Sequence, residues 1–458
     1  MKNSIIILVA TLGMFIISCN NTTHLKQEKG EKQQFKTERQ LPLEWTKNAN
    51  IYEVNIRQYS KEGTFNAFAK SLPRLKEMGV DILWFMPIHP IGIKNAKGSL
   101  GSYYAVRNYK AVSDDYGTIE DFKALVDKAH KLGMHVLIDW VANHTSWDNV
   151  WLIEHEDYYE KDSIGNFISP FDWSDVIALD YKNESMREAM ADALKFWLTE
   201  TNIDGFRCDV AGEVPTDFWE WVRPQLNAVK PVFMLAEAEK PELLNKAFDM
   251  DYGWEFHHIM NGIAKGEKNA KDVIAYLNRE DEKFPQNSLK LYFITNHDEN
   301  SWNGTVSERL GDAADLCSVM TFTLGGMPLT YSGQESANNK RLKFFEKDVI
   351  DWKDYSKHVF LSKLIKIKHE NQAVWNGNFG GEYTILANNK DDKFLSFKKS
   401  KNGNELYILL NLSKDAYKVN VQTEDLSNYK QLINNGITLT EEMNTFIVAP
   451  WSYCIFIK

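Results

Sequence analysis

Short apolar runs alternate with longer amphipathic segments between Ile51 and Tyr331. The short runs have the length and the β-branched and aromatic content of buried strands. In the longer segments the apolar positions recur with a helical period, as in Phe65–Met78, Ile119–Leu132 and Met186–Glu200. Strands that alternate with helices predict a parallel sheet and α/β architecture. The predicted strands are Ile51–Ile56, Ile82–Phe85, His135–Trp140, Ile203–Cys208, Val232–Ala236, Phe248–Tyr252, Leu291–Thr295 and Pro328–Tyr331.

These eight strands predict a closed (β/α)8 TIM barrel over residues 45–378. A doubly wound open sheet is the alternative, but such a sheet carries a glycine-rich phosphate loop after its first strand, and none follows Ile51–Ile56. The connection after the third strand is long and rich in aromatic and acidic residues. A connection of this length is typical of a functional loop or a small subdomain, which we place at about 144–185.

The pattern changes again after about Phe379. Short segments of alternating polarity are separated by turn residues such as Asn388-Asn389 and Asn402-Gly403. This spacing predicts an antiparallel β-sandwich over 379–458. Its expected strands are Tyr383–Ala387, Phe394–Lys398, Leu406–Leu412, Tyr417–Val421, Phe446–Val448 and Tyr453–Ile457.

The N-terminus has the pattern of an export signal. Lys2 precedes an apolar run from Ile5 to Ile17, which is short for a membrane span. Ser18-Cys19 ends the run in a way that resembles a bacterial lipobox, in which the cysteine receives a lipid. We therefore expect a lipoprotein signal over 1–19, a polar tether over 20–44, and export to a bacterial outer membrane or cell surface through a lipid on Cys19. An ordinary signal peptide with a chance cysteine is the alternative.

Composition narrows the partners only slightly. The 458 residues carry a formal net charge of −10, which argues against a nucleic-acid partner because that partner requires a basic face. Four cysteines at wide spacing make neither a disulfide framework nor a metal motif. The 14 tryptophans are typical of a large core, although some of them could stack on sugar rings.

Acidic and histidine side chains end several of the predicted strands. Asp139 ends the third strand, Asp209 the fourth and Glu237 the fifth, and Asn296-His297-Asp298 follows the seventh. In a TIM barrel the carboxyl ends of the strands meet on one rim, where catalysis takes place. Glycoside hydrolysis needs two carboxyl groups there, one ionised and one protonated. Arg207, two residues before Asp209 on the same face of its strand, is expected to keep Asp209 ionised.

These segments resemble the ordered motifs of the α-amylase family of retaining glycoside hydrolases. The resemblance runs from about Ile51 to the C-terminus, and six motifs in order make it specific. The matching segments are Gly79-Val80-Asp81-Ile82-Leu83-Trp84 with Pro87, Asp139 with Asn143-His144, Gly205-Phe206-Arg207-Cys208-Asp209, Leu235-Ala236-Glu237, Phe293 with Asn296-His297-Asp298, and Gly326-Met327-Pro328 with Tyr331 and Gly333-Gln334-Glu335.

The resemblance implies a role for each matching residue. Asp209 would attack the anomeric carbon, Glu237 would act as acid and then base, and Asp298 would bind sugar hydroxyls and stabilise the transition state. Asp139 and Asn143 would support the structure. The side chains implied to hold the sugar at the cleaved bond are Tyr104, His144, Arg207 and His297.

The chain also departs from the family pattern. Val210-Ala211-Gly212-Glu213 stands where many members have a Lys-His pair, and Asn108 stands where an aspartate is usual, so the subsites on the leaving side are expected to differ. Members often bind calcium through the equivalent of Asn143 together with acids of the insertion. Calcium remains an open expectation here, and no other cofactor is expected. The acids available for it are Asp172, Asp175 and Asp180.

The expected function is hydrolysis of α-glucosidic bonds, foremost α-1,4 bonds, in starch-like glucans or maltooligosaccharides by double displacement. An exo-acting α-glucosidase, including one specific for α-1,6 bonds, or a transglycosylase would use the same residues. A non-catalytic glycan-binding surface lipoprotein is the alternative from another class, and the complete carboxylate set argues against it.

Overall fold

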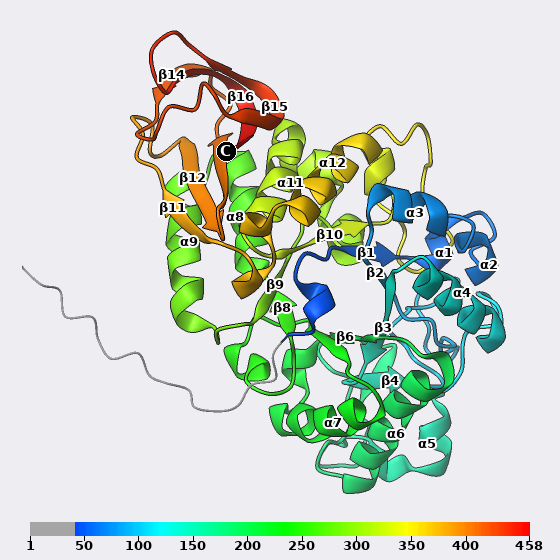
Figure 1. Ribbon diagram of the computed structural model, residues 1–458. Coiled ribbons are helices and arrows are strands. Elements are labelled where there is room, and N and C mark those ends of the chain that lie inside the picture. The colour runs from blue at the N-terminus through cyan, green and yellow to red at the C-terminus, as the bar shows by residue number, and fades with distance from the viewer. Residues whose placement is uncertain (1–41) are drawn as a thin grey trace, which may run out of the picture. The chain divides into compact units, whose positions relative to one another are not determined.

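The computed structural model describes residues 42–458, so Cys19, the expected signal and residues 20–41 of the expected tether lie outside the described residues. Eight parallel strands close into a barrel in the order β1-β10-β9-β8-β7-β6-β3-β2 (Figure 1). The predicted barrel is therefore confirmed, and the open-sheet alternative is wrong. The barrel strands are β1 (Ile51–Val54), β2 (Ile82–Phe85), β3 (His135–Val141), β6 (Gly205–Asp209), β7 (Phe233–Ala236), β8 (Met250–Tyr252), β9 (Leu289–Tyr292) and β10 (Met327–Tyr331).

The barrel strands are buried on both faces, which is why their sequences are almost continuously apolar. Ile82, Trp84 and Leu137 belong to a core inside the barrel, whereas Leu83 and Val136 belong to the core between strands and helices. The helices of the chain are α1 (Ile56–Tyr59), α2 (Phe65–Phe68), α3 (Leu72–Met78), α4 (Ile119–Lys131), α5 (Val150–Glu154), α6 (Glu184–Thr201), α7 (Thr216–Val229), α8 (Trp254–Lys265), α9 (Ala270–Lys283), α10 (Val306–Leu310), α11 (Ala314–Thr323) and α12 (His358–Glu370).

The helix expected over Phe65–Met78 is wrong as a single element. The chain forms two helices, α2 and α3, and Pro73 lies at the start of the second. Proline has no N–H group to donate to the preceding turn, so it is tolerated in the first turn of a helix but not in its interior. The apolar period continues across the break because Phe65, Phe68, Leu72 and Leu75 all face the same core.

The long connection after β3 contains a small two-stranded sheet. β4 (His144–Ser146) pairs antiparallel with β5 (Val176–Ala178), and α5 lies between them in the chain. Because β4 begins three residues after β3 ends, the insertion starts directly at the rim of the barrel.

The C-terminal region is antiparallel, as expected of the predicted sandwich, and its strands form one six-stranded sheet in the order β11-β12-β13-β16-β14 with β15 paired to β16 (orange to red in Figure 1). Its strands are β11 (Glu382–Ile385), β12 (Phe394–Lys401), β13 (Asn404–Asn411), β14 (Tyr417–Asn420), β15 (Lys430–Leu439) and β16 (Thr445–Ile457).

Two details of this sheet differ from the sequence expectation. β15 was not predicted, because polar residues interrupt the alternation of its apolar positions, and the last two predicted strands form the single strand β16. β16 pairs with β14 through its first part and with β13 through its last part, so both halves share one hydrogen-bonded network. Apolar side chains of this sheet, including Val448 and Phe456, form a hydrophobic core of their own.

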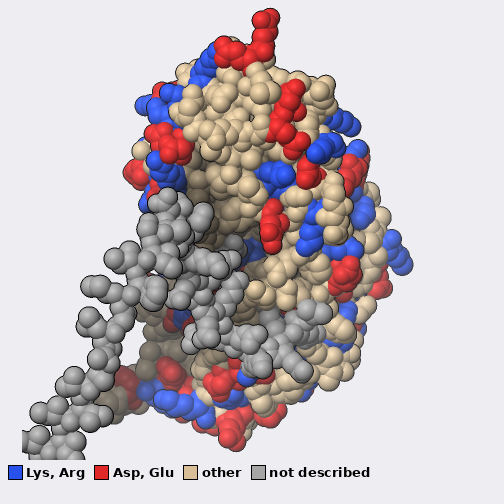
Figure 2. Space-filling view, turned by 60° about the vertical axis from the view of Figure 1, so that its left-hand side comes forward, with Lys and Arg blue, Asp and Glu red and all other residues tan. Residues whose placement is uncertain are grey.

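The surface shows no broad field of one charge on the face in Figure 2, where acidic and basic side chains are interspersed. Among residues 42–458, no helix has both the length and the apolar character that a membrane span requires.

Candidate active site

The barrel brings the expected carboxylates to one rim. β6 ends at Asp209, and its pairing of Cys208 with Ala236 of β7 places Glu237 beside Asp209. The Glu237 N–H donates to the carbonyl oxygen of Cys208 at 3.0 Å, which fixes this register at the rim. Asp298 follows β9, three strands from β6 in the barrel order. Asp209 and Glu237 are therefore the neighbouring pair, and Asp298 approaches from farther round the rim.

Arg207 joins three carboxyl groups at the centre of the site. Its guanidinium is fully buried. Nη1 lies 2.9 Å from Asp139 and 3.0 Å from Asp209, and Nη2 lies 2.7 Å from Glu237. Its Nε donates to the Tyr252 hydroxyl at 3.1 Å. A planar guanidinium presents several donors in a fixed geometry, so it can orient more than one carboxylate at once. Asp139 is fully buried and serves this cation, in keeping with the supporting role expected for it.

Asp209 and Glu237 differ in their affinity for a proton. Burial and the facing Glu237 carboxyl group hold the pKa of Asp209 well above its usual range. Burial disfavours the ionised form of Glu237 as well, but Arg207 and the Val210 N–H, which donates to Glu237 Oε2 at 2.8 Å, lower its pKa. The two carboxyl groups hydrogen-bond to each other, and their environments shift the pKa of Asp209 upward and that of Glu237 downward. Arg207 lowers the pKa of Asp209, in the direction expected from the sequence, but burial and the Glu237 carboxyl group act in the opposite direction.

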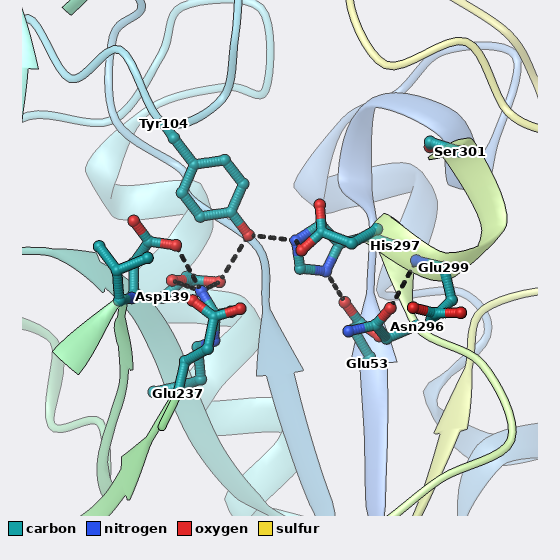
Figure 3. A network of polar contacts seen from close by, with 12 residues as sticks. Glu53, Tyr104, Asp139, Glu237, Asn296, His297, Glu299 and Ser301 are labelled. Atoms are coloured by element: carbon teal, nitrogen blue, oxygen red, sulfur yellow. Dashed lines mark hydrogen bonds and ion pairs between the residues drawn. The ribbon is translucent and has the colours of Figure 1, made fainter. Parts of the chain in front are cut away.

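Tyr104 connects the Arg207 cluster to His297, and its hydroxyl lies between Asp139 and the His297 ring (Figure 3). The Tyr104 hydroxyl donates to Asp139 at 3.0 Å and lies 2.7 Å from His297 Nε2. His297 Nδ1 lies 2.5 Å from Oε1 of Glu53, which is fully buried on β1. Burial alone would lower the pKa of His297, but Asp298 and Glu53 outweigh it and raise this pKa to about 9. His297 is therefore an imidazolium at neutral pH.

His144 lies beside these groups but outside the Arg207 network. It hydrogen-bonds to the Tyr104 backbone, and its ring centroid lies 5.4 Å from that of Trp173. Burial lowers the pKa of His144 to about 4, so it is neutral at pH 7 and can both donate and accept a hydrogen bond. The site thus combines one charged and one neutral histidine.

Three contributors to the site were not predicted from the sequence. Glu53 was detectable in principle, because an acid inside a continuously buried strand needs a partner. The Val210 N–H becomes available because Val210 adopts a left-handed conformation with φ of 35°, which no sequence motif indicates. Trp302, whose side chain donates to Asp298, lies in the π-helical turn Glu299–Asn303, and such turns are frequent at functional sites.

Two of the three acids available for calcium have separate partners. Asp175 pairs with Lys97 at 2.9 Å, and Asp180 accepts a hydrogen bond from the Lys182 N–H at 2.9 Å. Asn143 instead lines a cavity of about 310 Å³ whose nearest acids are Glu160 and Glu213. Within residues 42–458, no three acidic, histidine or cysteine side chains form a metal-binding group. Asp175 and Asp180 are thus engaged by different residues, and these two acids do not present a joint calcium site.

Comparison with known proteins agrees with this geometry. The family model described as "Alpha amylase, catalytic domain" matches residues 28–176 and 161–400. Alpha-amylase MalA of Haloarcula japonica is 25% identical over 346 residues, which cover 72% of this chain and 50% of that protein. Alpha-amylase 3 of Dictyoglomus thermophilum is 25% identical over 491 residues, which cover 90% of this chain and 93% of that protein.

Among solved structures, an α-amylase of Lactobacillus plantarum superposes with a TM-score of 0.81 and is 30% identical, over 90% of this chain and 99% of that one. The chain spans half the length of the Haloarcula relative but nearly the whole of the other two proteins. The family model covers more than half of the chain, including β1 to β10 and the rim residues described above. The chain belongs to the α-amylase family of glycoside hydrolases.

Proposed function

We propose that this protein hydrolyses α-1,4 bonds in starch-like glucans or maltooligosaccharides with retention of configuration. The observation that carries the proposal is the Arg207 cluster, which holds the hydrogen-bonded carboxyl groups of Asp209 and Glu237 side by side. A retaining mechanism needs two neighbouring carboxyl groups with one proton between them, and it needs no other cofactor.

In the first step Glu237 carries the proton of the pair and Asp209 is ionised. An Asp209 oxygen bonds to the anomeric carbon while the glycosidic bond breaks, and the leaving oxygen takes the Glu237 proton. In the second step Glu237 accepts a proton from water as the water oxygen bonds to the anomeric carbon. The bond to Asp209 breaks, and Asp209 is released as a carboxylate.

The remaining groups would hold the ring in place. Asp298, whose side chain is 35% exposed, is the carboxylate with most room to accept hydroxyl hydrogen bonds. Charged His297 would donate to a sugar oxygen, and neutral His144 could donate or accept. The Tyr104 ring stacks on His297 at 5.5 Å between centroids, which would fix the orientation of both rings beside the sugar.

The anomer formed first tests the mechanism. Two successive inversions should give the α-anomer of the new reducing end, recorded by NMR on a maltooligosaccharide before mutarotation. A 2-fluoro glucosyl fluoride should label Asp209, located by mass spectrometry of the digested protein. First formation of the β-anomer would falsify the retaining mechanism, and a label on Asp298 would exchange the two aspartates.

The same machinery allows three other readings. A transglycosylase would transfer the glucosyl unit to a second sugar, an α-1,6-specific enzyme would prefer isomaltooligosaccharides, and a glycan-binding protein would bind without cleaving. A product profile on amylose, pullulan and isomaltooligosaccharides separates them. We favour α-1,4 hydrolysis because two curated relatives of this chain are named α-amylases.

We further propose that the protein is exported and anchored to a bacterial outer membrane or cell surface through a lipid on Cys19. The apolar run that ends at this cysteine supports the proposal. Labelled palmitate should enter the wild type expressed in a bacterial host and should not enter Cys19→Ala. Cys317→Ala is the matched control, because Cys317 is buried in the barrel domain and should keep the label. Equal labelling of the wild type and Cys19→Ala would exclude the anchor.

A further inference from the structure

The loops at the catalytic rim differ in length from one side of the barrel to the other. Long connections follow β2 (86–118), β3 (142–183) and β10 (332–357). On the other side only 210–215 separates β6 from α7, and α8 begins directly after Gly253 at the end of β8. In the barrel order, one side consists of the consecutive strands β9, β10, β1, β2 and β3. The other side consists of β8, β7 and β6. The long loops therefore gather opposite the strand that carries Glu237.

Aromatic rings line the long-loop side. Phe344, after β10, lies nearly parallel to Tyr104, with an interplanar angle of 14° and centroids 6.2 Å apart. Trp302, after β9, packs on Phe344 at 5.1 Å and donates a hydrogen bond to Asp298. Its side chain is 53% exposed. These rings form a continuous surface from Tyr104 to beyond Asp298.

Residues 91–101, which we call the rim strap, extend this surface. At one end the Leu100 N–H donates to the Phe345 carbonyl at 3.0 Å. Gly98 has φ of +67°, and a Cβ there would lie 2.4 Å from Phe345 Cβ, so only glycine allows this close approach. The strap is thus fastened to the loop after β10.

The other end of the rim strap is fastened to the insertion after β3. Lys97 Nζ forms an ion pair with Asp175 Oδ1 at 2.9 Å, and the Asp175 side chain is only 6% exposed. The Ile93 N–H donates to Asp148 at 3.0 Å. The ion pair and this hydrogen bond join the strap to the insertion. A connected set of segments therefore runs from Trp302 through the rim strap to Asp175, which lies two residues from Trp173. We call this set the wall.

The position of Glu237 identifies which end of the substrate faces this wall. Glu237 protonates the leaving oxygen, which is attached to C1 of the cleaved sugar. In a glucosyl ring C4 lies opposite C1, and an α-1,4 chain continues toward its non-reducing end through O4. The non-reducing side therefore points away from β7, toward Asp298, Tyr104 and the wall. The reducing side extends over the short loops after β6 and β8.

We propose that this wall makes the enzyme act at the non-reducing ends of its substrates, so that it removes short sugars and does not cut inside long chains. The inference rests on the proposed function and specifies the substrate end that the same site accepts. Trp302 offers its exposed ring to the outermost sugar. The rim strap and its Lys97–Asp175 pair exclude a chain that continues past that sugar.

A maltoheptaoside blocked at its non-reducing end by a 4,6-ethylidene group tests the proposal against the unblocked sugar. We expect the unblocked sugar to lose short fragments from its non-reducing end, and the blocked sugar to be cut more than about tenfold more slowly, because a clash with a packed wall lowers kcat/KM for that substrate. Fragments are identified by chromatography and mass spectrometry. Similar rates on both sugars would overturn the chain-end proposal alone, whereas failure to cut either sugar would overturn the proposed function with it.

Two variants test whether the strap forms the wall. Lys97→Met combined with Asp175→Asn removes the ion pair without leaving a buried charge, and Gly98→Val forces the strap away from Phe345. Each should narrow the difference in rate between the blocked and unblocked sugars. Lys76→Met, an exposed lysine on α3, is the control and should keep the wild-type ratio. A folded double variant with an unchanged ratio would show that the strap does not exclude the longer chain.

Discussion

Asp209→Asn and Glu237→Gln are each expected to abolish nearly all hydrolysis of maltooligosaccharides while leaving the protein folded. Loss of the nucleophile should cost on the order of 10⁵-fold in kcat. Loss of the general acid should cost about 10²–10⁴-fold, which is the usual contribution of a positioned proton donor. The losses should not add in the double variant, because the two groups act in the same steps. Steady-state rates on maltoheptaose, with circular dichroism as a check of folding, measure both effects.

The two variants should differ on a substrate that needs no proton. α-Glucosyl fluoride has a good leaving group, so Glu237→Gln should retain much of its first-step rate on the fluoride, whereas Asp209→Asn should not. Glu188→Gln, an exposed glutamate on α6, is the matched control and should behave as wild type on both substrates. If Glu237→Gln lost both activities equally, Glu237 would not be the acid.

Arg207→Met is expected to reduce the free energy of unfolding by about 3–5 kcal/mol at pH 8, because it leaves buried carboxylates without their cation. Arg207 is fully buried and pairs with Asp139, Asp209 and Glu237. By contrast, Arg187→Met removes a surface pair with Asp217 at 2.8 Å and should cost at most about 1 kcal/mol. Denaturant titrations of both variants give the comparison.

The deficit of Arg207→Met should shrink as the pH falls. Burial already raises the pKa of Asp139 to about 6, and Arg207 is the strongest influence that lowers it. Without Arg207 this pKa rises further above that of the unfolded chain. A group with a raised folded-state pKa stabilises the fold at low pH and loses this contribution as the pH rises through that pKa. Unfolding of the variant at pH 5 and pH 8 measures the difference, and a deficit independent of pH would show that lost packing, and not the unpaired charge, destabilises the variant.

The sequence was sufficient to predict the architecture because the apolar runs that favour strands locally are also the runs that burial in a closed barrel requires. Ile82–Phe85 is predicted with its observed bounds, since a strand buried on both faces must be apolar throughout. Pro73 shows where periodicity alone is insufficient, because a missing N–H group divides a segment whose apolar period continues. β15 was missed because the strand is long, bulged and mostly exposed, so little of its sequence is constrained by burial.

The rim carboxylates could be proposed as catalytic from the sequence because a closed parallel barrel carries all its strand ends to one rim. Asp209, Glu237 and Asp298 are separated widely in the chain, yet Asp209 ends a strand and the other two follow one. The order of strands along the chain also indicated that Asp209 and Glu237 would be neighbours, as the β6–β7 pairing shows.

Only the tertiary structure decided the proton affinities of those groups and which loops contact one another around the rim. Arg207 contacts Glu237 as well as Asp209, Glu53 reaches His297 from the first strand, and Lys97 meets Asp175 across two loops. Proton affinity depends on burial and on every charge within a few ångströms, and these distances arise between segments far apart in the chain. The sequence by itself determined which residues reach the rim, because strand order and period are local properties. Packing determined their proton affinities and the space around them, because both are sums over contacts that form only when the barrel closes.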